Sequence, residues 1–572
     1  MQHKLMAVLI VLFAAYSFSF AERYARYNYV GYFPGSAKRI IIMSDDDCAG
    51  AKWGLLDQSK KEVTSGVVGK SVFGKGDHTP LPFNYEIDLS SVTAEGIYTL
   101  HLQGMADAVI NVRKNLLKNV IASNLRFFYV HRSGSKNCLD REPGHFADSA
   151  SVVYHRSGKE NTDEWTVDPK HRKFNLRGGW YDGNVYTKYT ASEAYATYYL
   201  LRAYEIQPAL FDKIYSATDN VDIIDNAKCG LDYLSKIMPN DSEFIIQVGG
   251  FKDNDGGIYL PDKDPRASKH ECYAILSQPQ MGLAAAALAL GSSVFAKLGK
   301  TEDALKYKQM AEKIFSKAVT VTTPPAWLEK DGVDPYKDET AADNMELAAI
   351  ELFKCTKNQE YVAKIQKYAK EAKTSGWSSV SEQNLAAHLR CIDVYPQVKK
   401  FVIEDLDGYL NTSTNNGNIW KLPIEYSDAS IYSYVEISSA VIQYQQTFKD
   451  KKYLPMAQSL LDYMFGCNNW GISFVSLKTV PNSVRNIFSQ IYRLQTRLFP
   501  EGSICPGPLD KKSQDDDMWC CFDKTTEPMY PFNTPKVNFF DNSDDESSVS
   551  TTLPGVADGI FLFTLASVLY AQ

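Results

Sequence analysis

Paired helical segments recur through most of this 572-residue chain and constrain its fold more than any other feature. From about residue 116 onward, apolar residues return with the 3.6-residue period of an amphipathic helix. Met281–Leu298 and Ala304–Ala318, for example, are separated only by a short turn at Gly299-Lys300. Short turns make consecutive helices antiparallel neighbours. Periodicity predicts about twelve helical segments between residues 118 and 571.

Long loops rich in Gly and Asp bear on how these helices are stacked. An open solenoid of helix pairs is the simpler alternative. The chain, however, carries long loops at 132–180, 247–272, 408–430 and 476–545. Loops longer than about 12–15 residues are usually functional. We therefore expect the helices to close into a ring whose loops build a cleft at one rim.

Residues 22–113 follow a different period, the two-residue alternation of β-strands. Arg39–Met43 and Gly96–Leu102 are short apolar runs, and clusters of Gly, Asp and Ser separate such runs. Several short strands at this spacing indicate a small antiparallel sandwich. We therefore expect two domains, at 22–113 and 114–572.

The first 21 residues have the layout of a secretory signal peptide. Lys4 precedes an apolar run from Leu5 to Phe20, and Ser19 and Ala21 place small residues at a cleavage site. The run has about 16 residues, fewer than the ~20 that span a bilayer, which disfavours the alternative of a membrane anchor. We expect a secreted or periplasmic monomer, in which no other stretch is long and apolar enough to cross a membrane.

Charge and cysteine spacing narrow the classes of partner. The net charge is −7 and there is no long basic run, so we expect no binding to nucleic acid. A neutral polysaccharide or oligosaccharide is indifferent to this charge. The ten cysteines contain no CxxC pair and so give no strong metal signal.

Four segments of the chain carry motifs. Residues 178–189 read Gly-Gly-Trp-Tyr-Asp-Gly-Asn-Val-Tyr-Thr-Lys-Tyr. They resemble the entry motif of glycoside hydrolase family 9, a family of cellulases, which reads Gly-Gly-Trp-Tyr-Asp-Ala-Gly-Asp-Tyr-x-Lys-Tyr. Further similarities lie at 338–352, 462–475 and 545–554. Asn28–Pro34 also resembles the opening of the immunoglobulin-like module that precedes many of these cellulases. The resemblance implies an all-β immunoglobulin-like sandwich followed by an all-α (α/α)6 barrel.

The resemblance also implies a reaction, the inverting hydrolysis of β-linked glucan by two carboxyl groups that flank the scissile bond. Glu546 takes the position of the general acid. Asp182 takes the position of the first motif aspartate, which orients the attacking water. Val185 stands where the family carries its second aspartate, the water-activating base, so we expect weakened hydrolysis or a role for Asp182 as substitute base.

Two further interpretations accompany these assignments. Asp544 and Asp545 are expected to help hold a proton on Glu546 by like-charge repulsion. The residues alone favour a solvated acidic loop at 544–546, and only the resemblance favours the acid. Asp182 also fits an Asx-type turn, which is compatible with its role. The alternative to an enzyme is a catalytically degenerate carbohydrate-binding protein that uses the same cleft.

Aromatic side chains are candidates for sugar contacts because sugar rings present apolar faces that stack on them. Those in or beside the long loops are Trp180, Tyr181, Tyr186, Trp420 and Trp470. For Trp180 and Trp470, a role as core anchors is an equal alternative. Arg485 lies in the loop where the family has a sugar-contacting His-x-Arg. We expect Arg485 to donate to sugar hydroxyl groups, with an isolated surface arginine as the alternative.

The resemblance bears on metals as well. Relatives with the sandwich module often hold zinc through Cys and His near a Phe-Tyr-x-x-Arg-Cys-Gly segment. Here Ser133 replaces that Cys, and His145 is the main histidine left downstream, so we expect no zinc. Asp253 and Asp255 suggest a calcium loop whose twelve-residue pattern fails at its end, so structural calcium stays open. The expected chemistry requires no cofactor.

Overall fold

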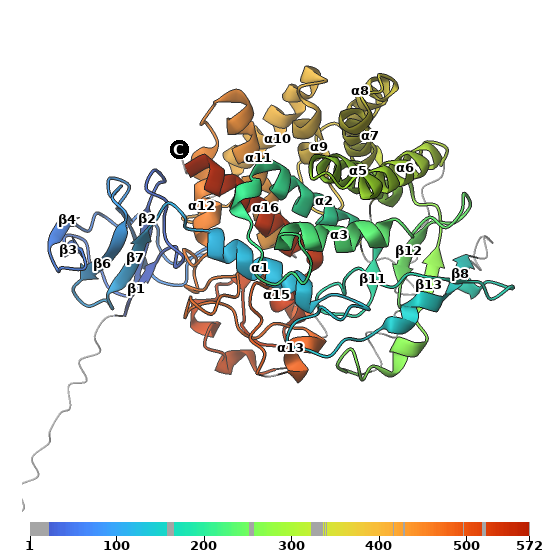
Figure 1. The fold of residues 1–572 in the computed structure, drawn as a ribbon. Helices are drawn as coiled ribbons and strands as arrows, with labels where there is room; N and C mark the ends of the chain where they lie inside the picture. Colours follow the sequence, from blue (N-terminus) through green and yellow to red (C-terminus); the bar gives the residue numbers. More distant parts are fainter. Residues whose placement is uncertain are drawn as a thin grey trace, which may run out of the picture.

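The computed structural model describes most of the chain after the expected signal peptide, which lies outside the described residues. These are 22–156, 165–250, 257–321, 336, 338, 340–415, 417–426, 430–495, 497–516 and 522–570. Figure 1 shows a β-sandwich at one end of the molecule and a larger helical domain beside it. Loops and a small sheet lie below the helices in that view.

The sandwich consists of two antiparallel sheets. One has the strand order β1-β2-β5 and the other the order β4-β3-β6-β7. The strands are β1 (Arg23–Arg26), β2 (Arg39–Ser44), β3 (Lys52–Leu56), β4 (Glu62–Val67), β5 (Phe83–Asp88), β6 (Gly96–Leu102) and β7 (Ala108–Val112). Alternate side chains of these strands face one shared core, as in β6, where Tyr98, Leu100 and Leu102 are buried.

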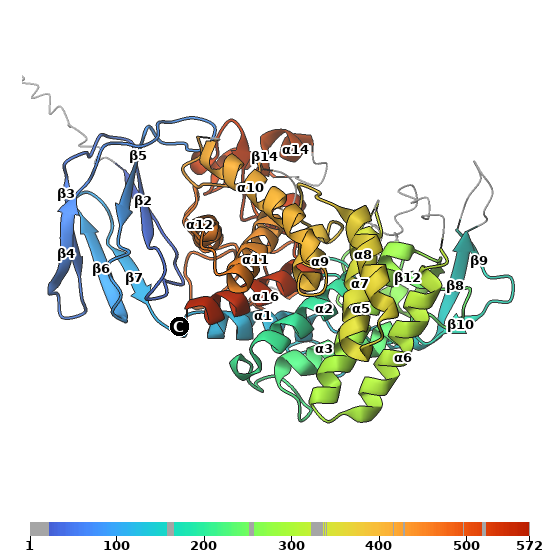
Figure 2. The ribbon, with the colours of Figure 1, turned by 90° about the horizontal axis from the view of Figure 1, so that it is seen from above.

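Strand β2 is buried on both faces, which explains its unbroken apolar sequence. Ile40 and Ile42 point into the core of the sandwich. Ile41 and Met43 belong instead to the core of the helical domain. Because side chains alternate along a strand, one strand can serve two cores only if both of its faces are covered. Figure 2 shows β2 on the side of the sandwich that faces the helices.

Hydrogen bonds fasten the sandwich to two places in the helical domain, residues 462–465 and residue 419. The side-chain amide of Asn28 donates to Asp462 at 3.0 Å, and the N–H of Tyr29 donates to the carbonyl of Phe465 at 3.0 Å. Arg39 donates to the carbonyl of Ile419 at 2.6 Å. The two domains therefore share polar as well as apolar contacts.

Twelve long helices of the described residues form a double ring. The inner ring runs α2-α5-α7-α9-α11-α16 and closes from α16 back onto α2. The inner helices are α2 (Thr190–Ile206), α5 (Gln278–Lys297), α7 (Ala342–Thr356), α9 (Asn384–Cys391), α11 (Ser430–Phe448) and α16 (Leu553–Tyr570). Their outer partners are α1 (Lys118–Val130), α3 (Asp222–Leu234), α6 (Thr301–Ala318), α8 (Glu360–Ala372), α10 (Lys399–Asn415) and α12 (Leu454–Met464). The expected (α/α)6 barrel is confirmed, and the open solenoid is not, because the ring closes.

Hydrophobic patterning places each helix in its ring. Helix α6 buries one face through Ala304, Tyr307, Ala311 and Ile314, whereas α5 is buried almost all round. A helix that is apolar on every side belongs inside a core or a membrane. Indeed α5 and α16 are long and apolar enough to cross a bilayer, contrary to our expectation that no further stretch would be. Their most apolar windows are 89% and 78% buried inside the protein, as suits core helices.

The rim loops are more regular than the sequence predicts. They form a mixed sheet with the order β10-β8-β13-β12-β11, to which β9 is added beside β8. The strands are β8 (Ser151–Arg156), β9 (Trp165–Val167), β10 (Lys173–Phe174), β11 (Lys188–Tyr189), β12 (Ile245–Val248) and β13 (Glu271–Ala274). Strand β11 leads directly into inner helix α2, so this sheet positions the residues before it.

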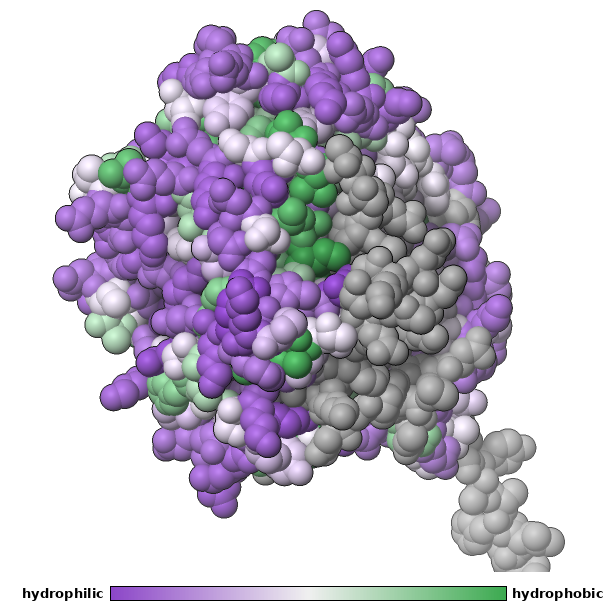
Figure 3. Space-filling model, turned by 90° about the vertical axis from the view of Figure 1, so that its right-hand side faces the viewer, coloured by the Kyte–Doolittle hydropathy of each residue, from purple (hydrophilic) through white to green (hydrophobic). Residues whose placement is uncertain are grey.

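The C-terminal rim loops contain only short elements. These are α13 (Gln490–Leu494), β14 (Leu509–Asp510), α14 (Lys511–Asp516), β15 (Val537–Asn538) and α15 (Glu546–Val549). Figure 3 views the end of the molecule that carries β8 and β9. This face is mostly hydrophilic, and apolar side chains gather mainly near its centre.

Candidate active site

The entry motif, residues 178–189, is a tight loop held from both sides. Gly178 and Gly179 have φ of +105° and +74°, which favours glycine. The N–H of Trp180 donates to Glu193 of α2 at 2.6 Å, and the N–H of Tyr181 donates to the carbonyl of His131 at 2.8 Å. These two hydrogen bonds hold the loop between α2 and the end of α1, and they fix the position of Asp182, the next residue.

Asp182 is buried at the base of this loop, with 4% of its surface exposed. Its Oδ2 accepts a short hydrogen bond from the Tyr336 hydroxyl. Burial raises the pKa of Asp182 to about 6, and hydrogen bonds from Tyr336 and Ser192 oppose the rise. Oδ1 is buried and has no hydrogen-bond partner among the described residues. A buried carboxylate oxygen in this state has the capacity to hold a water molecule.

Glu546 begins the short helix α15 and lies beside the entry motif. The side-chain amide of Asn184 donates to its Oε1 at 3.1 Å, across 362 residues of sequence. A Cβ placed on Gly183 would lie 1.8 Å from the carbonyl oxygen of Thr551, so the two segments are in backbone contact. The Ser489 hydroxyl donates to the carbonyl of Gly183 at 3.1 Å. Segments from the first and last thirds of the chain thus meet here.

The acidic neighbours of Glu546 have partners of their own. Asp544 forms an ion pair with Arg493. Asp545 is buried, caps α15 by accepting from the N–H of Ser548 at 3.2 Å, and accepts from Gln514 at 2.8 Å. An ion pair and a helix cap are contacts that charged carboxylates make, so like-charge repulsion of a second charge on Glu546 stays a prediction. The solvated acidic loop does not describe this segment, because Asp545 is buried.

Val185, at the expected base position, is half-buried. Its side chain has no group that accepts a proton. Asp182 is therefore the only carboxyl group within the entry motif.

All five aromatic residues expected to contact sugar are buried and serve as core anchors. Their exposed fractions are 0% for Trp180, 0% for Tyr181, 1% for Tyr186, 1% for Trp420 and 3% for Trp470. Each is packed or hydrogen-bonded within the protein. The Trp180 ring packs edge-on against Phe128, for example, and the Trp470 indole donates to Asn533 at 2.7 Å. A ring with no open face cannot stack on a sugar in this structure.

Arg485 is exposed, unlike the aromatic residues. Its guanidinium lies 5.7 Å from the centre of the Phe499 ring and donates to the carbonyl of Pro481 at 3.0 Å. Its backbone N–H donates to Asp541, which fixes the loop. The side chain remains a candidate for contacting sugar hydroxyl groups.

Sequence reasoning missed two side chains of this site. Asn184 stands where the family motif has glycine and was not among the expected site residues, yet it contacts Glu546. Tyr336, which holds Asp182, lies two residues before the family-like segment that starts at Asp338. That position next to a recognised segment was the one available signal.

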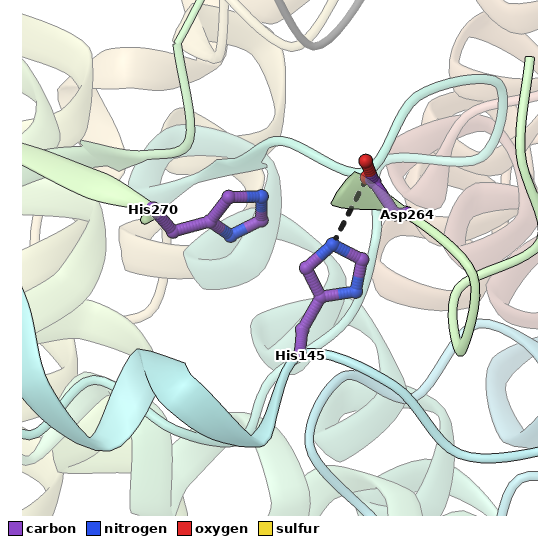
Figure 4. A group of neighbouring side chains, drawn as sticks. All are labelled: His145, Asp264 and His270. Carbon is purple, nitrogen blue, oxygen red and sulfur yellow. Dashed lines mark hydrogen bonds and ion pairs between the residues drawn. The ribbon is translucent and has the colours of Figure 1, made fainter. Parts of the chain in front are cut away.

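A group of metal-type side chains lies behind the motif. His145, Asp264 and His270 are buried, and one ligand atom from each lies within 4.8 Å of the others (Figure 4). Ser133, which stands in place of the family's zinc-binding Cys, is buried. Its hydroxyl lies 3.5 Å from Oδ2 of Asp148. A serine hydroxyl is a poor substitute for a zinc thiolate. Of the three grouped residues, the sequence singled out only His145, and the calcium candidates Asp253 and Asp255 lie outside the described residues.

A closed ring of six helical hairpins, with carboxyl groups at the loop-bearing rim and a β-sandwich beside it, defines a two-domain α/α-barrel protein. The chain belongs to glycosyl hydrolase family 9, whose model matches residues 118–557. Residues 22–107 match the cellulase N-terminal ig-like domain. The expected family and the expected sandwich are therefore both confirmed.

Curated relatives agree with this membership. Endoglucanase C of Cellulomonas fimi is 24% identical over 555 residues, and the match covers 88% of this chain and 48% of that protein. The chain thus spans about half the length of that relative. Cellodextrinase of Butyrivibrio fibrisolvens is 22% identical over 499 residues, covering 78% of this chain and 84% of that protein.

Solved structures share the fold over nearly the whole chain. A metagenome-derived glycoside hydrolase family 9 endoglucanase matches with a TM-score of 0.78 at 19% identity, covering 96% of this chain and 99% of that one. A family 9 protein from Bacteroides ovatus matches with a TM-score of 0.74 at 17% identity, covering 96% and 99%. At these identities the likeness concerns the fold.

Proposed function

We propose that this protein is an exported enzyme that hydrolyses a β-linked, cellulose-like glucan by an inverting acid/base mechanism. The observation that carries the proposal is the contact between Asn184 of the entry motif and Glu546, at 3.1 Å. Inverting hydrolysis needs two carboxyl groups from opposite sides of one bond. Asp182 and Glu546, whose segments are in contact, are the proposed pair.

In this mechanism Glu546 protonates the leaving glycosidic oxygen. Asp182 holds and activates the attacking water through Oδ1, the oxygen that has no partner among the described residues. With a pKa of about 6, raised by burial, Asp182 is ionised at neutral pH and is a better base than an exposed aspartate. The proton passes from water to Asp182, and the hydroxyl adds to the anomeric carbon on the face opposite the leaving group.

Val185 is the reason to expect a slow enzyme. Loss of a dedicated general base typically costs about 10²–10⁴ in rate. Asp182 recovers part of this loss in the proposal, because it stands three residues away in the same loop. Arg485 is proposed to donate to a hydroxyl group of the bound glycan.

A test with soluble β-glucan separates the proposal from its alternatives. Reducing-sugar release is measured for the full chain, for Glu546→Gln and for Asp182→Asn, and the anomer released first is followed by NMR. We expect turnover that both substitutions reduce by at least about 10²-fold, and an inverted first product. Turnover unaffected by Glu546→Gln contradicts the assignment of the acid.

The second candidate function is a glycan-binding protein without turnover, and the absence of a carboxyl group at Val185 favours it. The burial of Trp180, Trp420 and Trp470 weighs against it, because such proteins depend on open aromatic faces. Isothermal titration with cello-oligosaccharides distinguishes the two. Binding that survives Glu546→Gln, with no turnover by either protein, identifies a receptor.

A further inference from the structure

Two buried carboxyl groups face each other inside the helical ring, away from the proposed catalytic pair. Glu436 belongs to α11 and Asp558 belongs to α16, which lies between α11 and α2 in the inner ring (Figure 2). The two residues are 8% and 2% exposed. Their side chains are hydrogen-bonded to each other. The proposed mechanism uses neither group, so their burial in contact calls for another role.

Two hydroxyl groups complete the network around this pair. The Tyr195 hydroxyl of α2 lies 2.9 and 3.0 Å from the two oxygens of Asp558, to which it donates. The Ser378 hydroxyl donates to Oε2 of Glu436 at 2.7 Å. The network therefore joins three neighbouring inner helices, α11, α16 and α2.

This geometry requires a proton on the pair. An ionised carboxylate has no hydrogen to donate, so a hydrogen bond between two carboxyl groups needs one of them to be protonated. The other titratable side chains that face the pair are Tyr199 of α2 and Tyr409 of α10, and no Lys, Arg or His of the described residues forms an ion pair with either carboxyl group. Two like charges in contact, without a cation, cannot both persist in a buried site. Burial raises the pKa of both Glu436 and Asp558.

Helix α2 connects the network to Asp182. Ser192, in the first turn of α2, is hydrogen-bonded to Asp182, and Tyr195 follows three residues later. Residues three apart lie on the same face of a helix, one turn from each other. The hydrogen bond from Tyr195 therefore fixes Asp558, and with it α16, against the face of α2 that holds Asp182.

Helix α11 connects the network to the segment that follows Glu546. The Tyr432 hydroxyl of α11 lies 3.4 Å from the carbonyl oxygen of Ser550, four residues after Glu546. Glu436 follows Tyr432 by four residues and so lies on the same face of α11. Both proposed catalytic segments are thus held by helices that the carboxyl pair joins one turn further inside the ring.

We propose that Glu436 and Asp558 share one proton and act as positioning residues, which hold the segments of Asp182 and Glu546 in register with each other. The shared proton joins α11 to α16, and the hydrogen bond from Tyr195 joins α16 to α2. Loss of the proton leaves two like charges in contact, which push α11 and α16 apart. The consequence for catalysis rests on the proposed function, whereas the shared proton and the hold on the two segments do not.

The pair should make the protein weaker at alkaline pH. The folded chain binds the shared proton more tightly than the unfolded chain does, because the folded pKa is raised. Its contribution to stability is therefore present at low pH and is lost as the pH rises through the folded pKa. In Asp558→Asn, the amide that replaces the carboxyl group donates to Glu436 without a titrating proton, so this loss should disappear.

Infrared spectra of the full-length chain at neutral pH test for the proton. A protonated carboxyl group has a carbonyl stretching band that a carboxylate lacks, and Asp558→Asn should lose the intensity of one such group. Glu351→Gln is the matched control and should lose none. Glu351 also accepts from a tyrosine of α2, Tyr198 at 3.0 Å, but it is paired with Arg390 at 2.5 Å. Equal band intensity in wild type and Asp558→Asn overturns the proposal.

Melting temperature and hydrogen exchange test the hold on the two segments. Between about pH 6 and about pH 8.5, the melting temperature of wild type should fall by several degrees more than that of Asp558→Asn. At the alkaline pH, backbone amides of residues 546–552 should exchange several-fold faster in wild type than in the variant. Equal exchange of this segment in the two proteins overturns the positioning role. Glu436→Gln supplies an amide from the other side of the pair and should behave like Asp558→Asn, so the test does not depend on one variant folding.

Turnover of soluble β-glucan adds the catalytic readout. The ratio of kcat at about pH 8.5 to kcat at about pH 6 should be at least about threefold higher in Asp558→Asn than in wild type. An unchanged ratio in an active enzyme contradicts the positioning role. A wild-type chain without turnover contradicts the proposed function alone, because the infrared and exchange results decide the role of the pair without it.

Discussion

The side-chain amide of Asn184 donates a hydrogen bond to Oε1 of Glu546 at 3.1 Å, although 362 residues separate the two in sequence. The family motif has glycine where this chain has Asn184. The protein therefore adds a polar group beside its proposed acid at the place where it has lost the usual base. We infer that Asn184 is a positioning residue that limits the rotamers of Glu546.

Replacing Asn184 by the family's glycine tests this role. One hydrogen bond of this kind contributes about 0.5–1.5 kcal/mol, so Asn184→Gly should lower kcat by about 2–10-fold on soluble β-glucan. Asn482→Gly, an exposed asparagine in a rim loop, is the control and should leave kcat unchanged. An Asn184→Gly enzyme with wild-type kcat and KM would show that the contact does not orient the acid.

Restoring the missing carboxyl group should accelerate the reaction. Val185→Asp places a second carboxylate in the entry motif, and a general base typically contributes about 10²–10⁴ in rate. Since Asp182 already supplies part of this, we expect kcat to rise by at least about tenfold. Val67→Asp, on an exposed strand of the sandwich, controls for the added charge. No gain in kcat would mean that proton removal from water is not limiting.

Gly183 is required by contact as well as by backbone conformation. Its φ is +73°, and a Cβ there would lie 1.8 Å from the carbonyl oxygen of Thr551. Gly183→Ala should therefore push the 546–552 segment away and lower the free energy of unfolding by more than about 2 kcal/mol. Gly376→Ala has a similar φ of +68° but open space around it, and should cost about 1 kcal/mol. If chemical denaturation shows that both variants lose the same free energy of unfolding, the whole effect of Gly183→Ala comes from backbone conformation and none from the contact with Thr551.

The burial of Asp182 makes stability depend on pH. Its pKa rises from 3.8 unfolded to about 6 folded, chiefly by burial, so the folded protein binds the proton more tightly. The free energy of unfolding should accordingly fall as pH rises from about 4 to 6, by up to about 3 kcal/mol from this group. Asp182→Asn should remove that slope and leave the protein more stable than wild type at pH 7. Denaturant titrations at pH 4 and pH 7 measure the free energy of unfolding of both proteins. If that free energy changes with pH by the same amount in wild type and Asp182→Asn, burial does not raise the pKa of Asp182.

The double burial of β2 should couple the unfolding of the two domains. Ile41 is fully buried and packs into the core of the helical domain, although it belongs to the sandwich. Ile41→Ala should destabilise the protein by about 2–5 kcal/mol and lower one shared calorimetric transition. Val109→Ala, half exposed in the same sandwich, should have little effect. Two separate transitions in the Ile41→Ala protein, with only the sandwich affected, would show that the domains fold independently.

Much of the candidate site was predictable because its residues lie in ungapped motifs. Asp182 and Glu546 were assigned from the resemblance, and the structure brings their segments together. The burial of the aromatic residues contradicts the expected sugar contacts and favours the alternative role of Trp180 and Trp470 as core anchors, for a physical reason. Trp180 and Trp420 are the largest fully buried side chains among the described residues, and large apolar rings fill a core as readily as they line a cleft. Position beside a long loop does not distinguish these two uses.

Periodicity and turn chemistry are local properties, so the sequence by itself determined the β-sandwich and the paired helices, while the resemblance of its motifs indicated the family. Contacts between distant residues are not local, and the tertiary structure alone decided them. The Asn184–Glu546 hydrogen bond, the hold of Tyr336 on Asp182, and the grouping of His145 with Asp264 and His270 all depend on how the ring closes. Their energies come from burial and geometry that no short stretch of sequence encodes.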